Sequence, residues 1–164
     1  MKPESQGGHN NRPAFCLEDI EAQLGRCCVA GPASPRKIAD AEKELGVEFP
    51  DGYRWFLGKY GAALCEGFRI AGLFEEGPDD EPPLWSNVVT YTSQLRHASH
   101  GRFPSHYLAI SDDGGDYKFY LDISCLDLTR ECPVIVEGPG VDGKVVAGTF
   151  IEFLARTFDD DISF

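Results

Sequence analysis

The segment IADAEKELGVEFPDGYRWFLGKYG, residues 38–61, contains two helical patterns in succession. The first pattern predicts a helix over residues 35–45, whose apolar side chains share one face: Ile38, Ala41 and Leu45. Ser34 supplies a capping hydroxyl, Pro35 suits the first helical turn, and Gly46 ends the run. An amphipathic helix of this kind must bury its apolar face against a partner element.

The second pattern predicts a helix over residues 50–60, in which apolar side chains recur at the i, i+3, i+4, i+7 spacing of one helical face. These side chains are Tyr53, Phe56, Leu57 and Tyr60. Phe49 and Pro50 set the entry to this helix, and Gly61 ends it. The aromatic rings on its face predict that the helix packs into the core.

The rest of the chain alternates between helical and strand patterns. Further helices are expected over residues 14–25, from a Ser86 cap to about His97, and from a Thr149 cap to Phe158. Strands are expected at residues 68–74, 107–110, 117–123, 134–136 and 144–147. Residues 27–33 are expected to form a loop, and Asp142-Gly143 a turn. This order predicts an α+β fold, with N-terminal helices, an antiparallel β-meander and a C-terminal helix packed on the sheet.

Length and composition fit one compact domain. The 164 residues are 42% hydrophobic and include 11 Phe, which is enough to bury a substantial core. Residues 1–13 are polar and show no hydrophobic period, so we expect a lead-in before a single domain over residues 14–164. The apolar faces predict that eight side chains share one core: Tyr53, Phe56, Leu57, Phe119, Leu121, Phe150, Phe153 and Leu154.

The chain is strongly acidic. It carries 27 acidic against 15 basic side chains, a formal net charge of -12. This charge repels nucleic acid and anionic membranes and attracts a basic protein. The alternative is that the charge only keeps the protein soluble.

The cysteines and the N-terminal residues indicate the compartment. The first 15 residues contain no apolar run that suits a signal peptide, and no later stretch is long enough to cross a bilayer, so we expect a cytoplasmic protein. In a reducing compartment we expect six free thiols and no structural metal. These cysteines are Cys16, Cys27, Cys28, Cys65, Cys125 and Cys132.

Residues 138–144 have the glycine and lysine spacing of a phosphate-binding loop. Val145 stands where a hydroxyl would hold magnesium, and Pro139 has no N–H to offer a phosphate. The residues that follow are β-prone and do not open a helix. We therefore expect an ordinary glycine-rich loop here and no nucleotide site.

Other polar residues are possible metal ligands or catalytic groups. Four carboxylates gather around one predicted hairpin, without the spacing of a calcium loop: Asp112, Asp113, Asp116 and Asp122. Three histidines lie on one polar stretch, without the helical pair and carboxylate of a zinc site: His97, His100 and His106. No motif places a nucleophile beside a base. We expect a solvated turn, no metal, no cofactor and no enzymatic activity.

The spacing of residues 38–61, the strand that follows and two later motifs together resemble the SUKH superfamily, the Smi/Knr-like proteins. The later motifs are Tyr107-Leu108-Ala109-Ile110 before the turn at residues 112–117, and Thr149-Phe150-x-x-Phe153-Leu154. The resemblance implies an α+β fold. For most bacterial members it also implies an immunity protein that binds a polymorphic or contact-delivered toxin domain. A minority of relatives are regulatory scaffolds, including fungal cell-wall regulators, so a regulatory or scaffolding protein-binding module is the alternative.

Two acidic loops are candidate contacts for a basic toxin domain that acts on nucleic acid or nucleotides. The first comprises Glu75, Glu76, Asp79, Asp80 and Trp85, and the second Asp112, Asp113 and Asp116. Loops on a rigid scaffold are common recognition sites, and opposite charge speeds capture. The alternative for each residue is a solvated position without a partner. A monomer that occludes the active site of the toxin is the favoured arrangement, and a small-molecule binder that uses the concavity of the sheet is a third hypothesis.

Overall fold

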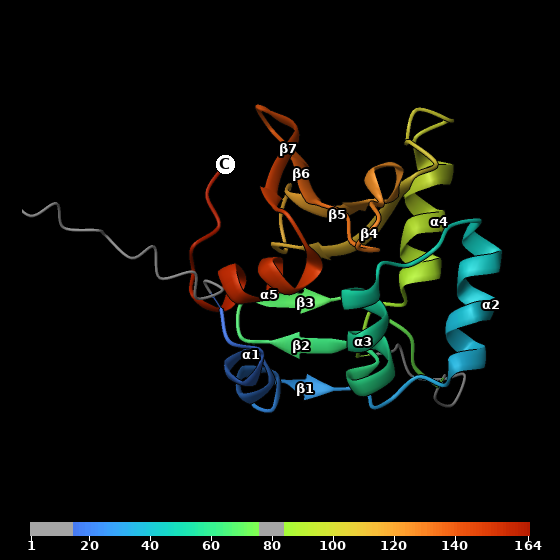
Figure 1. The fold of residues 1–164 in the computed structure, drawn as a ribbon. Coiled ribbons are helices and arrows are strands. Elements are labelled where there is room, and N and C mark those ends of the chain that lie inside the picture. The colour runs from blue at the N-terminus through green and yellow to red at the C-terminus, as the bar shows by residue number, and fades with distance from the viewer. Residues whose placement is uncertain (1–14, 76–83) are drawn as a thin grey trace, which may run out of the picture.

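The computed structural model describes residues 15–75 and 84–164 (Figure 1). Within these two stretches, seven strands form one antiparallel sheet whose spatial order follows the sequence from β1 to β7. The strands are β1 Cys28–Val29, β2 Ala63–Cys65, β3 Phe68–Ile70, β4 Tyr107–Asp112, β5 Lys118–Asp122, β6 Val134–Gly138 and β7 Val141–Ala147. The helices are α1 Leu17–Leu24, α2 Pro35–Leu45, α3 Asp51–Tyr60, α4 Val88–Ala98, η1 Ile123–Cys125 and α5 Phe150–Phe158. The predicted α+β architecture is confirmed.

Two of the three predicted side-chain caps are confirmed, Ser34 for α2 and Thr149 for α5. Ser34 accepts a hydrogen bond from the N–H of Lys37, and Thr149 accepts one from the N–H of Glu152. The predicted cap of α4 at Ser86 is wrong, because the side chain of Asn87 caps this helix. The carbonyl of Ser86 instead accepts a hydrogen bond from the N–H of Gly72, so residue 86 still belongs to the segment beside β3.

Glu42 fixes the connection between α2 and α3. Its Oε1 accepts hydrogen bonds from the N–H of Phe49 at 2.7 Å and from Nε of Arg54 at 2.9 Å. A charged acceptor that is shared in this way makes stronger hydrogen bonds than a neutral one. The spacing of the segment 38–61 therefore places these hydrogen bonds of Glu42 beside the apolar faces of α2 and α3.

The main core lies between one face of the sheet and the helices α1, α3 and α5. All eight predicted core side chains are buried in this one cluster: Tyr53, Phe56, Leu57, Phe119, Leu121, Phe150, Phe153 and Leu154. The ring of Phe150 lies 5.0 Å from that of Tyr53 and 5.4 Å from that of Phe56. The hydroxyl of Tyr53 donates to the carbonyl of Ala71 at 2.6 Å, and burial raises the pKa of this phenol.

The opposite face of the sheet is covered by α4. Ala109, Tyr120 and Ile135 form a second, smaller cluster there, and the α4 side chains Tyr91 and Leu95 pack against it. Helix α4 also contacts α2, so these two helices stand side by side at one edge of the molecule (Figure 1). No helix of the described residues is long and apolar enough to cross a membrane.

Residues 27–33 were predicted to be a loop, but they begin with β1. Cys28 and Val29 pair with Leu64 and Ala63 of β2, a strand that was also missed. This pairing brings the neighbouring Cys27 and Cys65 to a Cα distance of 4.5 Å, and the two cysteines form a disulfide.

The prediction of six free thiols is therefore wrong for one pair. The four free cysteines are Cys16, Cys28, Cys125 and Cys132, of which only the last is buried. The error arose because Cys27 and Cys65 have a sequence separation of 38, so no local spacing reveals their proximity.

Three smaller boundaries also differ from the predictions. Helix α1 begins at Leu17 instead of Ala14. The turn between β6 and β7 lies at residues 139–140, so Asp142 and Gly143 belong to β7. The strand predicted over residues 68–74 ends at Ile70 as β3, and β2 precedes it as its hairpin partner.

Candidate partner-binding surface

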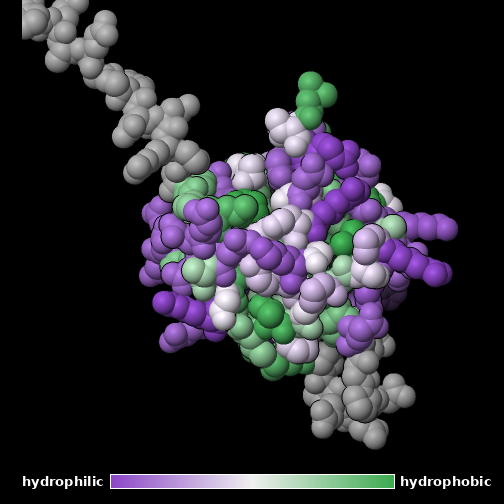
Figure 2. Space-filling view, turned by 60° about the horizontal axis from the view of Figure 1, so that its bottom comes forward, coloured by the Kyte–Doolittle hydropathy of each residue, from purple (hydrophilic) through white to green (hydrophobic). Residues whose placement is uncertain are grey.

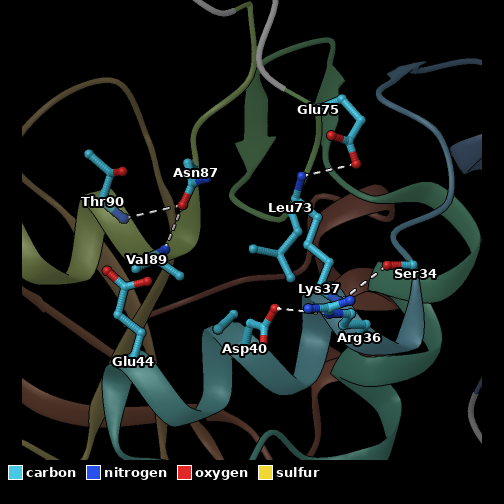
Figure 3. A pocket seen from close by; sticks show the side chains of 11 residues that line it. Ser34, Arg36, Lys37, Asp40, Glu44, Leu73, Glu75, Asn87, Val89 and Thr90 are labelled. Carbon is cyan, nitrogen blue, oxygen red and sulfur yellow. Dashed lines mark hydrogen bonds and ion pairs between the residues drawn. The ribbon is translucent and has the colours of Figure 1, made fainter.

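A groove runs between α2 and α4 on the outside of the molecule (Figure 3). Its first part is a hollow of about 500 Å³. The side chains that line it come from α2, from the end of the β3 segment and from the start of α4: Ser34, Arg36, Lys37, Asp40, Ala41, Glu44, Leu73, Glu75, Asn87, Val89 and Thr90. Ala41 and Leu73 are buried and form an apolar floor under charged walls.

The groove continues along α4 as a second hollow of about 550 Å³. Glu44, Val89 and Thr90 line both hollows, so the two are adjacent parts of one surface. His97 lies at the far end. Hollows of this size accommodate a few side chains of a partner segment.

Glu75 from the first predicted acidic loop lies at the mouth of this groove. Its carboxylate is 3.1 Å from Nζ of Lys37, and 92% of the side chain is exposed (Figure 3). An exposed ion pair of this kind contributes little to stability. The carboxylate is therefore available to a basic group of a partner at small energetic cost.

Trp85 from the same predicted loop has a structural contact. Its indole N–H donates to the carbonyl of Cys28 at 3.1 Å, and its ring packs 5.9 Å from that of Phe74. These contacts hold the segment before α4 against β1. The other three predicted residues of this loop lie outside the described residues: Glu76, Asp79 and Asp80.

Asp112 from the second predicted loop is mostly buried and already paired. Only 15% of its side chain is exposed, and Oδ1 lies 3.4 Å from the guanidinium of Arg69. Its other oxygen accepts from the hydroxyl of Tyr91 at 3.4 Å. Burial and the nearby carboxylate together raise the pKa of this tyrosine. Asp112 thus links β3, β4 and α4.

The two other residues of this loop lie at the surface of the β4–β5 turn. Asp113 shapes the turn, because its Oδ1 accepts from the N–H groups of Gly115 at 2.8 Å and Tyr117 at 3.3 Å. Asp116 is exposed and makes no hydrogen bond or ion pair within the part of the chain that the structure describes. Among the described residues, Glu75 and Asp112 do not come together, since Glu75 faces α2 and Asp112 lies between β3 and α4.

The α2–α4 groove itself was not predicted. Each helix shows a polar face in sequence, but only the packing of the two helices creates a hollow between these faces. The sequence signal is limited to the charged positions one turn apart on α2, Arg36 and Asp40, which form an exposed ion pair.

The glycine-rich stretch that could suggest a phosphate-binding loop has a structural explanation. The glycine-rich stretch at residues 138–144 is the β6–β7 hairpin, where Tyr117 packs on Gly138 and donates to the carbonyl of Pro139 at 3.2 Å. In residues 15–75 and 84–164, no group of three or more His, Cys, Asp or Glu side chains is placed to hold a metal ion.

Comparison with known proteins identifies the family. Residues 32–156 match the SMI1 / KNR4 family (SUKH-1). The chain belongs to this family. The match begins after α1 and β1, so both of these elements precede the matched residues. The family is of the immunity-protein type, and its members are generally non-enzymatic binding proteins.

One relative is similar over a short stretch. The chain is 44% identical over 43 residues to a Bacillus subtilis (strain 168) protein that carries the name "Uncharacterized protein YnaB". This stretch covers 26% of the chain and 30% of the relative. The similarity therefore supports relatedness over part of the domain and carries no function.

Proposed function

We propose that this chain is an immunity protein that binds a toxin domain of a bacterial polymorphic or contact-delivered system and occludes its active site. The observation that carries the proposal is the match of residues 32–156 to the SMI1 / KNR4 family (SUKH-1). Occlusion by binding needs a rigid scaffold and an accessible surface, and it needs no catalytic group. The buried aromatic core provides the scaffold.

The charge of the protein supports a basic partner. A formal net charge of -12 creates a long-range field that attracts positively charged surfaces. Toxins that act on nucleic acid or nucleotides need positively charged clefts to hold phosphates. Hydrophilic side chains cover most of the face drawn in Figure 2, and apolar side chains occupy small, separate areas of it. A polar surface of this kind suits fast, electrostatically guided capture.

Two regions are the proposed contact surfaces. The first is the mouth of the α2–α4 groove, with Glu75, together with Glu76, Asp79 and Asp80, which follow Glu75 in the sequence. The second is the β4–β5 turn, with Asp113 and Asp116. Trp85 and Asp112 support these regions from within, because each holds its own segment in place. An exposed carboxylate in either region would meet lysine or arginine side chains of the toxin.

A regulatory or scaffolding module is the second candidate, and the shape of the groove favours it. Two adjoining hollows of about 500 and 550 Å³ provide room for a short peptide segment. A partner of this kind would be a host protein rather than a toxin, and its binding would protect no cell.

Co-expression tests the immunity function. The full chain is expressed together with the C-terminal variable domain of a large toxin encoded by the neighbouring gene, and growth is measured. We expect growth to be restored to the level of cells that carry an inactive toxin variant. A purified complex of the two proteins should accompany the rescue. Unrestored growth despite soluble, folded protein would reject the proposal for that toxin.

A further inference from the structure

Leu128 is the most exposed large apolar side chain of the described residues. Its exposure is 104%, as in a free peptide, whereas the next most exposed, Val145, reaches 57%. Leu128 lies in the loop between η1 and β6. Two other apolar side chains of this region turn inward, because Leu126 packs against the core and Cys132 is buried. One leucine thus projects alone from a loop that is anchored at both ends.

The loop that carries Leu128 is closed by its own hydrogen bonds. The N–H of Asp127 donates to the carbonyl of Glu131, and the N–H of Arg130 donates to the carbonyl of Asp127, both at 3.0 Å. The Oδ1 atom of Asp127 also accepts from the N–H and the hydroxyl of Thr129, at 2.8 and 2.5 Å. These bonds hold the backbone on both sides of Leu128 in one conformation.

The same loop is docked on the start of α3. Pro50 offers no side-chain cap for this helix. The carbonyl of Arg130 instead accepts from the N–H of Asp51 at 2.9 Å, and the carboxylate of Glu131 accepts from the N–H of Gly52 at 2.9 Å. Movement of the loop would leave these N–H groups without partners. The position of Leu128 is therefore fixed relative to the core.

Three exposed carboxylates lie at the base of the loop: Asp127, Glu48 and Asp51. The guanidinium of Arg130 pairs with Asp51 at 3.1 Å and lies 3.9 Å from Glu48, whereas the carboxylate of Glu131 is turned inward onto the start of α3. The hydroxyl of Thr129 and neighbouring N–H groups lower the pKa of Asp127, which keeps this side chain charged. Three exposed carboxylates against one guanidinium leave the surroundings of Leu128 negative.

We propose that the loop of Leu128 is a further partner-binding surface beside the two acidic regions, and that Leu128 is its apolar anchor, inserted into an apolar pocket of a protein partner that is rimmed by lysine or arginine side chains. Burial of a leucine is favourable, and little conformational entropy is lost because the loop is already ordered. The exposed carboxylates at the base of the loop would meet the basic rim. The inference rests on the proposed function only for the identity of the partner, which would be the toxin domain.

Binding of the purified toxin domain to the full chain tests this anchor by surface plasmon resonance. We expect Leu128→Ser to weaken binding by about ten- to a hundredfold, mainly through faster dissociation. Leu128→Met should retain most of the affinity, because it preserves apolar volume. Val145→Ser is the matched control on β7 and should bind like the parent. All three variants should unfold at the temperature of the parent, because both positions are exposed.

The outcomes separate the anchor from the immunity function. If the parent binds the toxin domain and Leu128→Ser binds equally well, the anchor is wrong and the immunity function stands. If the parent instead self-associates with rising concentration and Leu128→Ser abolishes this, the occupant is a second copy, and the proposal of a separate partner is overturned.

If the parent does not bind the toxin domain, the proposed immunity function is rejected for that toxin, while the proposed anchor is still open to a test. A photo-cross-linking amino acid then tests whether Leu128 contacts another protein. It is placed at position 128 or at position 145 of the full chain in the source cells. Two results together support the anchor. Position 128, and not position 145, forms an adduct with one protein, which mass spectrometry identifies. The purified form of this protein then binds the parent at least tenfold more tightly than it binds the Leu128→Ser variant. The absence of an adduct specific to position 128 overturns the anchor.

Discussion

At the scale of single residues, buried aromatic side chains stabilise the core. Phe153 is 1% exposed, and its ring lies 5.3 Å from that of Phe119 across the junction of α5 and the sheet. We expect Phe153→Ala to lower the free energy of unfolding by about 3 to 5 kcal/mol, because it removes a buried ring and leaves a cavity. Denaturant unfolding measures this loss. Phe164→Ala provides the control, since Phe164 is 41% exposed and should cost far less; equal losses would contradict the assigned packing.

Periodicity in the sequence identifies buried side chains, but it does not identify which surface carboxylates are free to bind a partner. Periodicity placed Phe119 and Phe153 in the core correctly, because each element exposes one apolar face. It could not show that Asp112 is paired with Arg69. That fact depends on the pairing of β3 with β4, which sets Arg69 opposite Asp112 in the sheet. A carboxylate in a turn therefore resembles a binding residue in sequence, whatever strand lies beside it.

At the scale of elements, the pairing of β1 with β2 brings Cys27 and Cys65 together. The disulfide between Cys27 and Cys65 closes a loop across a sequence separation of 38 residues, and this restricts the unfolded chain. We expect reduction, or the double substitution Cys27→Ser with Cys65→Ser, to lower the free energy of unfolding by about 2 to 4 kcal/mol. Denaturant unfolding with and without reductant measures the loss.

A thiol titration provides the control for this prediction. Unfolded, unreduced protein should show the four free cysteines, and reduction should reveal all six. The substitution Cys28→Ser should leave the stability unchanged, because this neighbouring thiol is exposed and free. Six thiols before reduction would mean that the bridge does not form in solution.

Elements were predictable where they have start signals or long apolar patterns. Helices α2 and α5 begin at capping hydroxyls, and these signals are local. Strand β1 has only two residues, which is too short to show an alternating pattern. It exists because β2 offers hydrogen-bonding partners, and β2 itself becomes a strand through its hairpin with β3. Pairing of this kind depends on tertiary contacts.

The fold class was predictable at the scale of the whole molecule, but the binding surface was not. The order of helices, antiparallel strands and closing helix restricts the architectures that can bury every apolar face. The α2–α4 groove arises from the relative placement of two helices, and 42 residues lie between the end of α2 at Leu45 and the start of α4 at Val88. No sequence motif marks this groove. Leu128 was missed for a different reason, because a lone leucine in a polar loop has no period.

Net charge belongs to the whole molecule, and it predicts how the partner is captured. If this acidic chain blocks a basic toxin domain, the association rate should fall as salt screens charges beyond roughly 10 Å at 0.1 M. Charge reversal at Glu75, Glu76, Asp79 and Asp80 together, or at Asp113 and Asp116 together, should separate the two proposed surfaces. Asp112 is kept, because its reversal would place two cations against each other at Arg69.

Stopped-flow association of the toxin domain, measured at several salt concentrations, separates these variants. The set of substitutions that faces the partner should slow association and flatten its salt dependence, while dissociation changes less, because rim charges act mainly during encounter. Leu128→Ser should show the opposite division, with an unchanged association rate and faster dissociation, since an apolar contact forms only after docking. Circular dichroism must show that each variant is folded. If neither charge set alters the association rate, the acidic loops are solvated surface, and the loop of Leu128 or α1 becomes the place to search for the interface.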